Sequence, residues 1–180
     1  RLTVHTGVED FPKFSPDGRM IAFTGDYNER LNSLFVMPAE GGRPNQLTWH
    51  TDSAEPVEWT PDGKKIVFRS RRDSFVSFFK QFYTVSPDGG LPVDMGIGKG
   101  SLASFSPDGK KMALNRHPER FWWWKRYKGS QNQDVWVYDF EKETYENLTD
   151  YEGNDSWPMW TGNRIYYVTC LLYTSPSPRD

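Results

Sequence analysis

The sequence has little of the chemistry on which many enzymes and disulfide-stabilised domains depend. Its 180 residues contain one cysteine, Cys170, and three histidines, His5, His50 and His117. A single cysteine excludes an internal disulfide and a cysteine-based zinc cluster. No Gly-x-Ser-x-Gly nucleophile elbow occurs in the sequence. We therefore expect no catalytic residue, no metal site and no cofactor within this chain.

Long apolar runs and an excess of one charge are also absent. No run approaches the roughly 20 residues that cross a bilayer, the formal net charge is -2 and the pI is near 6.0. Because nucleic acids and anionic membranes attract concentrated positive charge, we expect neither as a partner. The single cysteine fits a reducing compartment, so we expect a cytoplasmic protein. The sequence begins at Arg1 without a signal segment, which suggests a missing N-terminus and leaves a periplasmic or exported location open.

The sequence is rich in one repeated phrase. Phe-Ser-Pro-Asp-Gly occupies 14–18 and 105–109, and Trp-Thr-Pro-Asp-Gly occupies 59–63. Serine or threonine at the first corner, proline presetting φ at the second and a closing glycine are typical of a tight turn. Each copy begins with an aromatic residue and precedes an apolar run, so the phrase predicts the same β-hairpin three times.

Each copy belongs to a unit of four predicted strands. The fourth strand of the second unit is expected at Val93–Ile97, ended by Gly98. An additional Ser-Pro-Asp-Gly at 86–89 is expected between a third and a fourth strand, because its glycine pair matches the pair at 41–42. The predicted boundaries are 1–9 for the last strand of a preceding unit, 10–54, 55–101 and 102–156 for complete units, and 157–169 for the start of another.

The spacing of the turn glycines indicates the architecture. Gly18, Gly63, Gly109 and Gly162 follow one another at 45, 46 and 53 residues. A period of roughly 40 to 50 residues favours an all-β fold, the β-propeller built from four-stranded antiparallel blades. We predict an arc with three complete blades and parts of two others. Residues 170–180 contain no repeat element, and we expect them to be a non-native, adaptor-like tail.

Several stretches of the sequence have residue types that occur in functional sites. His5 and His50 follow equivalent strands, which favours structural roles. The glycine-rich stretch 96–101 lacks phosphate-loop spacing, and the acidic residues of 150–155 lack calcium-loop spacing. Interleaved cations and aromatic residues remain as candidates for contact with peptides, either as a solvated rim or as a patch that steers ligands. These candidates are Arg69, Arg71, Arg72, Arg116, His117, Trp124, Lys125, Arg126 and Tyr127.

The three adjacent tryptophans of the long loop at 116–133 allow two interpretations. Packing between blades is favoured over ligand contact, because three indoles cannot all face water comfortably. Stacking on nucleic-acid bases is the least favoured interpretation, because the chain is acidic overall.

The repeat region resembles the N-terminal six-bladed β-propeller of tricorn-type proteases and, more broadly, TolB-like propellers. The resemblance rests on the stretches 10–18, 36–42 and 63–70, and above all on Trp124–Gly129 leading into Asp134–Asp139. It covers residues 1–169. The chain departs from the family's pattern after the last strand, where it reads Cys170-Leu171-Leu172.

The resemblance implies a propeller segment of a serine peptidase that trims peptides. The catalytic region of such a protein would lie outside this chain, and the propeller would shape the passage of peptides and help to assemble a homo-oligomer. The expected partners are therefore peptides and the rest of its own protease chain. A TolB-like binding propeller without a peptidase, and the propeller cap of a prolyl-oligopeptidase-type enzyme, stay open as alternatives.

Overall fold

Antiparallel β-strands make up the regular structure of the computed structural model. The described residues are 2–27, 32–75, 79–118, 129, 132–150 and 153–169. Within them the strands form three sheets of four and one sheet of two, and each strand pairs with its neighbours in sequence. The all-β class and the four-stranded antiparallel blades predicted from the sequence are confirmed.

The four sheets follow the order of the repeats. The first sheet contains β1 (Glu9–Phe14), β2 (Met20–Gly25), β3 (Ser33–Pro38) and β4 (Asn45–Gln46). The second contains β5 (Glu55–Trp59), β6 (Ile66–Ser70), β7 (Gln81–Val85) and β8 (Val93–Lys99). The third contains β9 (Ala103–Phe105), β10 (Lys111–Asn115), β11 (Val135–Asp139) and β12 (Thr144–Asn147). The last contains β13 (Asp155–Thr161) and β14 (Arg164–Thr169).

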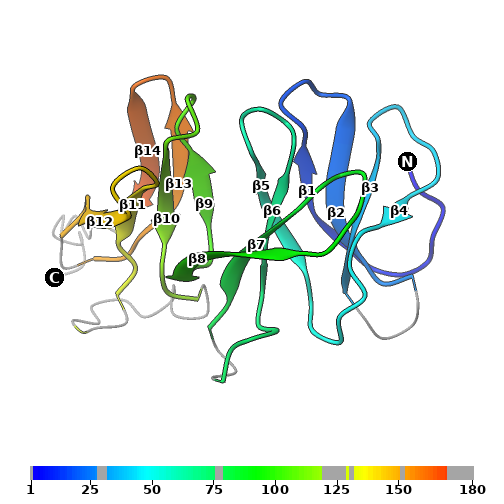
Figure 1. Ribbon diagram of the computed structural model, residues 1–180, viewed down its shortest axis with the longest axis horizontal. Helices are drawn as coiled ribbons and strands as arrows, with labels where there is room; N and C mark the ends of the chain where they lie inside the picture. Colours follow the sequence, from blue (N-terminus) through cyan, green and yellow to red (C-terminus); the bar gives the residue numbers. More distant parts are fainter. Residues whose placement is uncertain are drawn as a thin grey trace, which may run out of the picture.

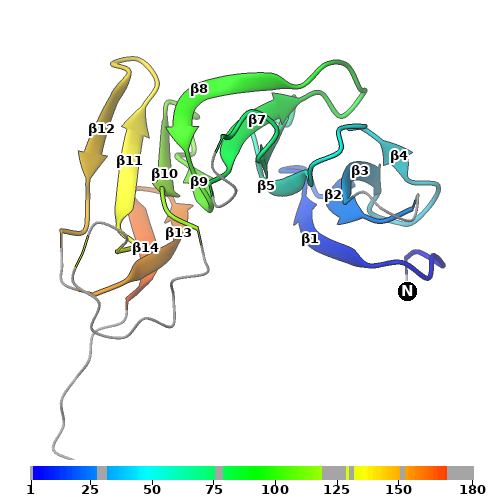
Figure 2. The same ribbon diagram turned by 90° about the horizontal axis from the view of Figure 1, so that it is seen from below.

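The sheets are arranged side by side in an open arc. The first strand of each sheet contacts the first strand of the next, from β1 to β5, β9 and β13 (Figure 2). These four strands lie toward the concave side of the arc, whereas β4, β8 and β12 lie toward its outside. This is the arrangement of blades around a propeller axis.

Apolar side chains fill the space between neighbouring blades. Leu34 and Val36 of the first blade belong to one buried cluster with Trp59 and Phe68 of the second. The second and third blades share another buried cluster, which includes Phe82. A third cluster joins the third blade to the last sheet. Each blade is therefore buried mainly by its neighbours, as expected for a repeat fold.

The three copies of the turn phrase have the same hydrogen bonds. The Ser15 hydroxyl donates to Asp17 Oδ1 at 2.6 Å, and the main-chain N–H of Arg19 donates to the same oxygen at 3.1 Å. The Thr60 and Ser106 copies repeat both bonds. The additional copy is different, because the Ser86 hydroxyl accepts from the N–H of Asp88. It joins β7 to β8, as predicted, so position within the blade determines what the phrase does.

The turn carboxylates predict a dependence of stability on acid. The hydroxyl hydrogen bonds, followed by the main-chain N–H bonds, hold the pKa values of Asp17, Asp62 and Asp108 below their usual range. A carboxyl whose pKa is depressed by folding stabilises fully above its unfolded pKa, and this stabilisation is lost as the pH falls through the folded pKa. Urea unfolding from about pH 5 to about pH 2 should therefore show a shallower loss in the triple Asp→Asn variant than in wild type. Parallel curves would contradict this.

Three predicted boundaries were wrong in detail. Leu2–Val4 forms no strand, because no described strand lies beside it to pair with. Strand β8 continues to Lys99 instead of ending at Ile97, since Gly96 and Gly98 adopt positive φ within an irregular part of the ladder while Lys99 still pairs with Gln81. Strand β13 begins at Asp155, before the expected start at 157, because Asp155 pairs with Thr169.

Candidate functional site

The second strand of each blade ends at the same end of the arc. Strands β2, β6 and β10 all run toward this end, away from the Pro-Asp-Gly turns (Figure 1). The predicted cations at 69–72 and 116 are at the ends of β6 and β10, so the fold brings both groups to this end. Lys99 joins them, because it pairs with Gln81 at the start of β7. We term this region the loop end.

A hydrogen bond from a repeated position joins each blade to the next. The donor lies six residues after the turn glycine, near the end of the second strand, and the acceptor is a main-chain carbonyl at the start of the following blade. The three pairs are Thr24 Oγ1 to Ala54 O at 2.9 Å, Arg69 Nη1 to Ser101 O at 2.7 Å, and Asn115 Nδ2 to Asp155 O at 2.8 Å. The fold thus uses one position three times, with three different side chains.

Arg69 lies inside the protein instead of at a solvated rim, which corrects the expectation from sequence. Its side chain is 3% exposed, and its Nε lies 2.8 Å from Glu55 Oε2. Lys80 Nζ lies 2.5 Å from both carboxylate oxygens of Glu55. Burial raises the pKa of Glu55, but Arg69 and Lys80 together outweigh burial and hold the pKa below its usual range. The three residues form a charged centre between the second and third blades.

Arg71 and Arg72 differ from each other in their surroundings. Arg71 is exposed and pairs with Asp52, with 3.0 Å between Nη2 and Oδ1. The Arg72 guanidinium carbon lies 5.0 Å from the Phe68 ring centre and 4.9 Å from that of Tyr83. Its Nη2 is buried and has no hydrogen-bond partner, and burial lowers the pKa of Arg72.

Arg116 and Lys99 also lie on aromatic faces. The Arg116 guanidinium carbon is 4.9 Å from the Tyr145 ring centre and 5.3 Å from that of Trp136. Lys99 Nζ is 3.7 Å from the ring centre of Phe79. Among the described residues, neither cation has an ion pair with a carboxylate, and the same is true of Arg72. The loop end therefore carries three positive charges that lie on aromatic rings, and none of them has a carboxylate of the described residues within ion-pair distance.

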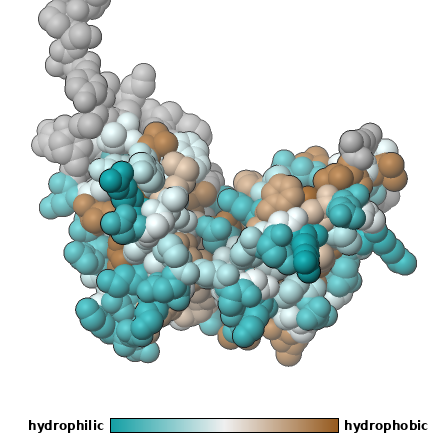
Figure 3. All heavy atoms as spheres, turned by 90° about the horizontal axis from the view of Figure 1, so that it is seen from above, coloured by the Kyte–Doolittle hydropathy of each residue, from teal (hydrophilic) through white to brown (hydrophobic). Residues whose placement is uncertain are grey.

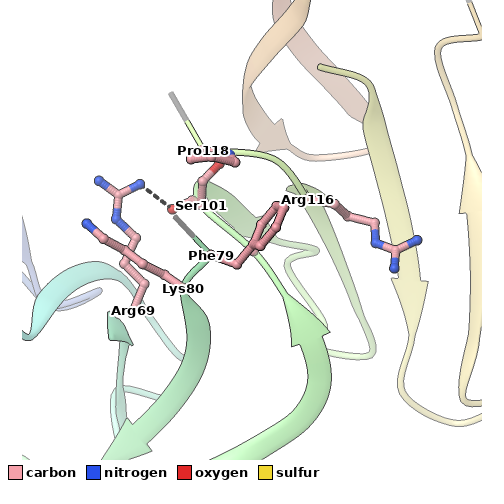
Figure 4. A pocket seen from close by; sticks show the side chains of 7 residues that line it. Arg69, Phe79, Lys80, Ser101, Arg116 and Pro118 are labelled. Atoms are coloured by element: carbon pink, nitrogen blue, oxygen red, sulfur yellow. Dashed lines mark hydrogen bonds between the residues drawn. The ribbon is translucent and has the colours of Figure 1, made fainter. Parts of the chain in front are cut away.

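A small cavity of about 30 Å³ lies between the second and third blades at the loop end. Arg69, Lys80, Phe79, Ser101 and Pro118 line it, whereas the Arg116 side chain points away from Arg69 and Lys80 (Figure 4). A cavity of this size holds one or two water molecules. Contact with a larger ligand must therefore use the outer surface of the loop end.

His117 is half-buried beside these cations. Its ring centre lies 6.3 Å from that of Phe79. Burial, followed by the charges of Arg116 and Lys99, lowers the pKa of His117. We predict that Arg116→Gln raises the pKa of His117, because it removes one positive charge while burial keeps the value below normal. NMR titration of the imidazole measures this, with Lys64→Gln at the opposite end as the control. An unchanged pKa in Arg116→Gln would show that the two groups are not coupled.

The structure describes the two remaining histidines, but not the candidates at 124–127. His5 Nδ1 accepts from the N–H of Gly7 at 2.9 Å, and His50 Nδ1 accepts from the N–H of Asp52 at 3.0 Å. Both histidines close their own turns, which confirms their predicted structural role. Trp124, Lys125, Arg126 and Tyr127 lie outside the described residues. Sequence reasoning missed Phe79 and Lys80, which match no motif, and it set Lys99 aside together with the glycine-rich stretch 96–101.

Two kinds of feature are absent from the described part of the chain. No group of three or more histidine, cysteine, aspartate and glutamate side chains is placed to hold a metal ion. No helix there is long and apolar enough to span a membrane.

The concave side of the arc is an open hollow between two lobes, and apolar surface is visible on both of them (Figure 3).

The consecutive four-stranded blades, their radial order and their repeated inter-blade bonds define this protein as part of a β-propeller. The family model described as the tricorn protease N-terminal β-propeller domain matches residues 1–169, and the chain belongs to this family. It is 28% identical over 191 residues to tricorn protease homolog 1 of Streptomyces coelicolor, covering 97% of this chain. It is 25% identical over 178 residues to the tricorn protease of Thermoplasma acidophilum, covering 94% of this chain.

Solved structures support the same fold. The tricorn protease crystal structure superposes with a TM-score of 0.77 at 22% identity, covering 94% of this chain and 17% of that one. A putative TolB from Agrobacterium tumefaciens gives a TM-score of 0.73 at 21% identity, covering 93% of this chain and 57% of that one. The chain spans 17% of the Streptomyces relative and 16% of the Thermoplasma relative. The relatives are therefore much longer proteins.

Proposed function

We propose that this propeller segment serves a tricorn-type serine peptidase by contacting peptides as they pass to or from a catalytic region elsewhere in the protein. The observation that carries the proposal is the loop end, where Arg72, Lys99 and Arg116 lie on aromatic rings and have no carboxylate partner among the described residues. Such cations attract the carboxylates of a peptide, either at its C-terminus or on acidic side chains. In this proposal the full-length protein is a cytoplasmic homo-oligomer.

A peptide-binding measurement tests the role of the loop end. Fluorescence anisotropy would compare a labelled hexapeptide that has a free C-terminal carboxylate with its C-terminal amide. We expect the free carboxylate to bind more tightly, and the double variant Lys99→Gln/Arg116→Gln to weaken its binding by about tenfold, since a charge-assisted hydrogen bond contributes on the order of 1.5–3 kcal/mol.

The opposite end of the arc supplies a matched control. Arg19→Gln/Lys64→Gln removes the same charge from the Pro-Asp-Gly turns, where both side chains are exposed. This control should bind the peptide as wild type does. Equal weakening in both double variants would show that binding depends only on the net charge of the protein. Equal binding of the carboxylate and amide peptides would overturn the proposed contact.

A TolB-like binding propeller without a peptidase is the second candidate. The observation behind this candidate is the similarity in fold to the putative TolB structure, with a TM-score of 0.73. Sequencing the DNA downstream of the codon for Thr169 separates the two candidates. A serine-peptidase region in the same frame supports the first, and a stop codon after the propeller supports the second.

A further inference from the structure

The junction between the third blade and the last sheet contains buried oxygen atoms without partners. Asn115 and Gln133 are 0% exposed and Asp155 is 2% exposed. Asn115 Oδ1, Gln133 Oε1 and Asp155 Oδ1 are each buried and accept no hydrogen bond. A buried polar atom without a partner is costly, so three of them in one junction require an explanation.

Hydrogen bonds between the three residues hold them together. Asn115 Nδ2 donates to the main-chain oxygens of Asp134 and Asp155, both at 2.8 Å, so its amide group lies between those two segments. The N–H of Asp155 donates to the main-chain oxygen of Gln133 at 2.6 Å. Because both amide nitrogens are already used as donors, exchanging amide oxygen and nitrogen would break bonds to main-chain carbonyls.

The preceding junction shows what is missing. Asn115 occupies the position that Arg69 occupies one blade earlier, six residues after the turn glycine. There the guanidinium of Arg69 is buried with the carboxylate of Glu55, which neutralises it, and the partly exposed Lys80 also pairs with this carboxylate. In the later junction the same position carries a neutral amide, whereas the buried acceptor residue is Asp155.

Within the part of the chain that the structure describes, no side chain supplies the missing positive charge. Among the described residues, no lysine, arginine or histidine forms an ion pair with Asp134, Asp150 or Asp155. Arg116 follows Asn115 directly, but its guanidinium lies over Trp136 and Tyr145 on the other face of β10, as alternation along a strand requires.

We propose that this junction binds a hard, oxygen-coordinated cation of the calcium class through Asn115 Oδ1, Gln133 Oε1 and Asp155 Oδ1. Amide and carboxylate oxygens are the ligands that such ions prefer, and Ca²⁺ tolerates irregular sets with added water. One water molecule donates only two hydrogen bonds and brings no charge, so it cannot satisfy three acceptors and the carboxylate. The ion takes the structural role that the Arg69 guanidinium has in the preceding junction, and it joins the last sheet to the third blade.

The sequence does not predict this site, because its oxygens come from three separated segments. The acidic residues of 150–155 lack calcium-loop spacing, and two of the three ligands are amides. The sequence predicts no metal site because it contains no contiguous metal-binding motif. A site assembled from residues of two blades does not need such a motif.

Thermal unfolding of the EDTA-treated chain, with Ca²⁺, Mg²⁺ or K⁺ added at matched ionic strength, tests the proposal. We expect Ca²⁺ to raise the melting temperature by about 3–6 °C at ten times its Kd, because binding to the folded state alone shifts unfolding. Asp155→Asn should abolish the shift, and Asp150→Asn, which removes an exposed carboxylate nearby, should keep it. Each shift is measured within one variant, so a change in baseline stability cancels.

A direct measurement of Ca²⁺ binding tests the proposal even if the Asp155→Asn variant does not fold. Isothermal titration of the wild-type chain with CaCl₂ should give one site, and Gln133→Met should weaken it at least tenfold while leaving the carboxylate in place. A wild-type chain that neither binds Ca²⁺ nor gains stability from it would overturn the proposal, as would an equal shift in Asp155→Asn. A crystal structure grown in Ca²⁺ with only water in the junction, at hydrogen-bond distances instead of the 2.3–2.6 Å of Ca²⁺ ligands, would also overturn it.

Discussion

Replacing Glu55 with alanine should destabilise the protein by about 3–5 kcal/mol, because it leaves the buried charge of Arg69 without its partner. Arg69 is almost fully buried, and its Nε lies 2.8 Å from the Glu55 carboxylate. Lys80 is partly exposed, so it can turn toward water, but Arg69 cannot. Urea unfolding followed by circular dichroism measures the difference in free energy of unfolding.

Two further variants separate this effect from a general loss of an ion pair. Asp52→Ala breaks the exposed pair with Arg71 and should cost no more than about 1 kcal/mol. Glu55→Leu combined with Arg69→Met removes both buried charges and should recover most of the loss, since apolar pairs of similar volume often replace buried ion pairs without cost. Equal costs for Glu55→Ala and Asp52→Ala would show that Arg69 is not buried in solution.

Gly100→Ala should also be strongly destabilising, by about 3 kcal/mol, because the added methyl group has no space. A Cβ at this position would lie 1.8 Å from Cε2 of Phe82, far inside van der Waals contact. The Phe82 ring is fully buried, and the N–H of Gly100 is held by the main-chain oxygen of Lys80 at 2.9 Å. Neither the ring nor the backbone can move without disturbing the junction between the second and third blades.

A matched glycine distinguishes this overlap from backbone strain. Gly96 lies in the same strand region with φ of 69° and nothing within 4 Å of an added Cβ. Gly96→Ala should therefore cost only about 1–2 kcal/mol, the price of a left-handed conformation. Phe82→Leu should reduce the additional cost of Gly100→Ala, because it removes the contacted ring atoms. An additive double variant would contradict the overlap as the cause.

Some candidate residues were recognisable from sequence for a physical reason. Arg71, Arg72, Arg116 and His117 follow predicted second strands, and parallel second strands end on the same side of a propeller, so their clustering at the loop end follows from the repeat. Their partners did not follow from it. Tyr83, one of the two rings under Arg72, and both rings under Arg116 belong to other strands of the blade.

By itself the sequence determined the number, order and type of the hairpins, because turn chemistry and alternation act between residues close along the chain. Only the tertiary structure decided which polar side chains are buried, since their partners lie in the next blade. Arg69 meets a carbonyl 32 residues away, and Asn115 meets one 40 residues away. The burial of Arg69, and the contrast between its paired guanidinium and the unpartnered oxygens around Asn115, depend on how one blade packs against the next.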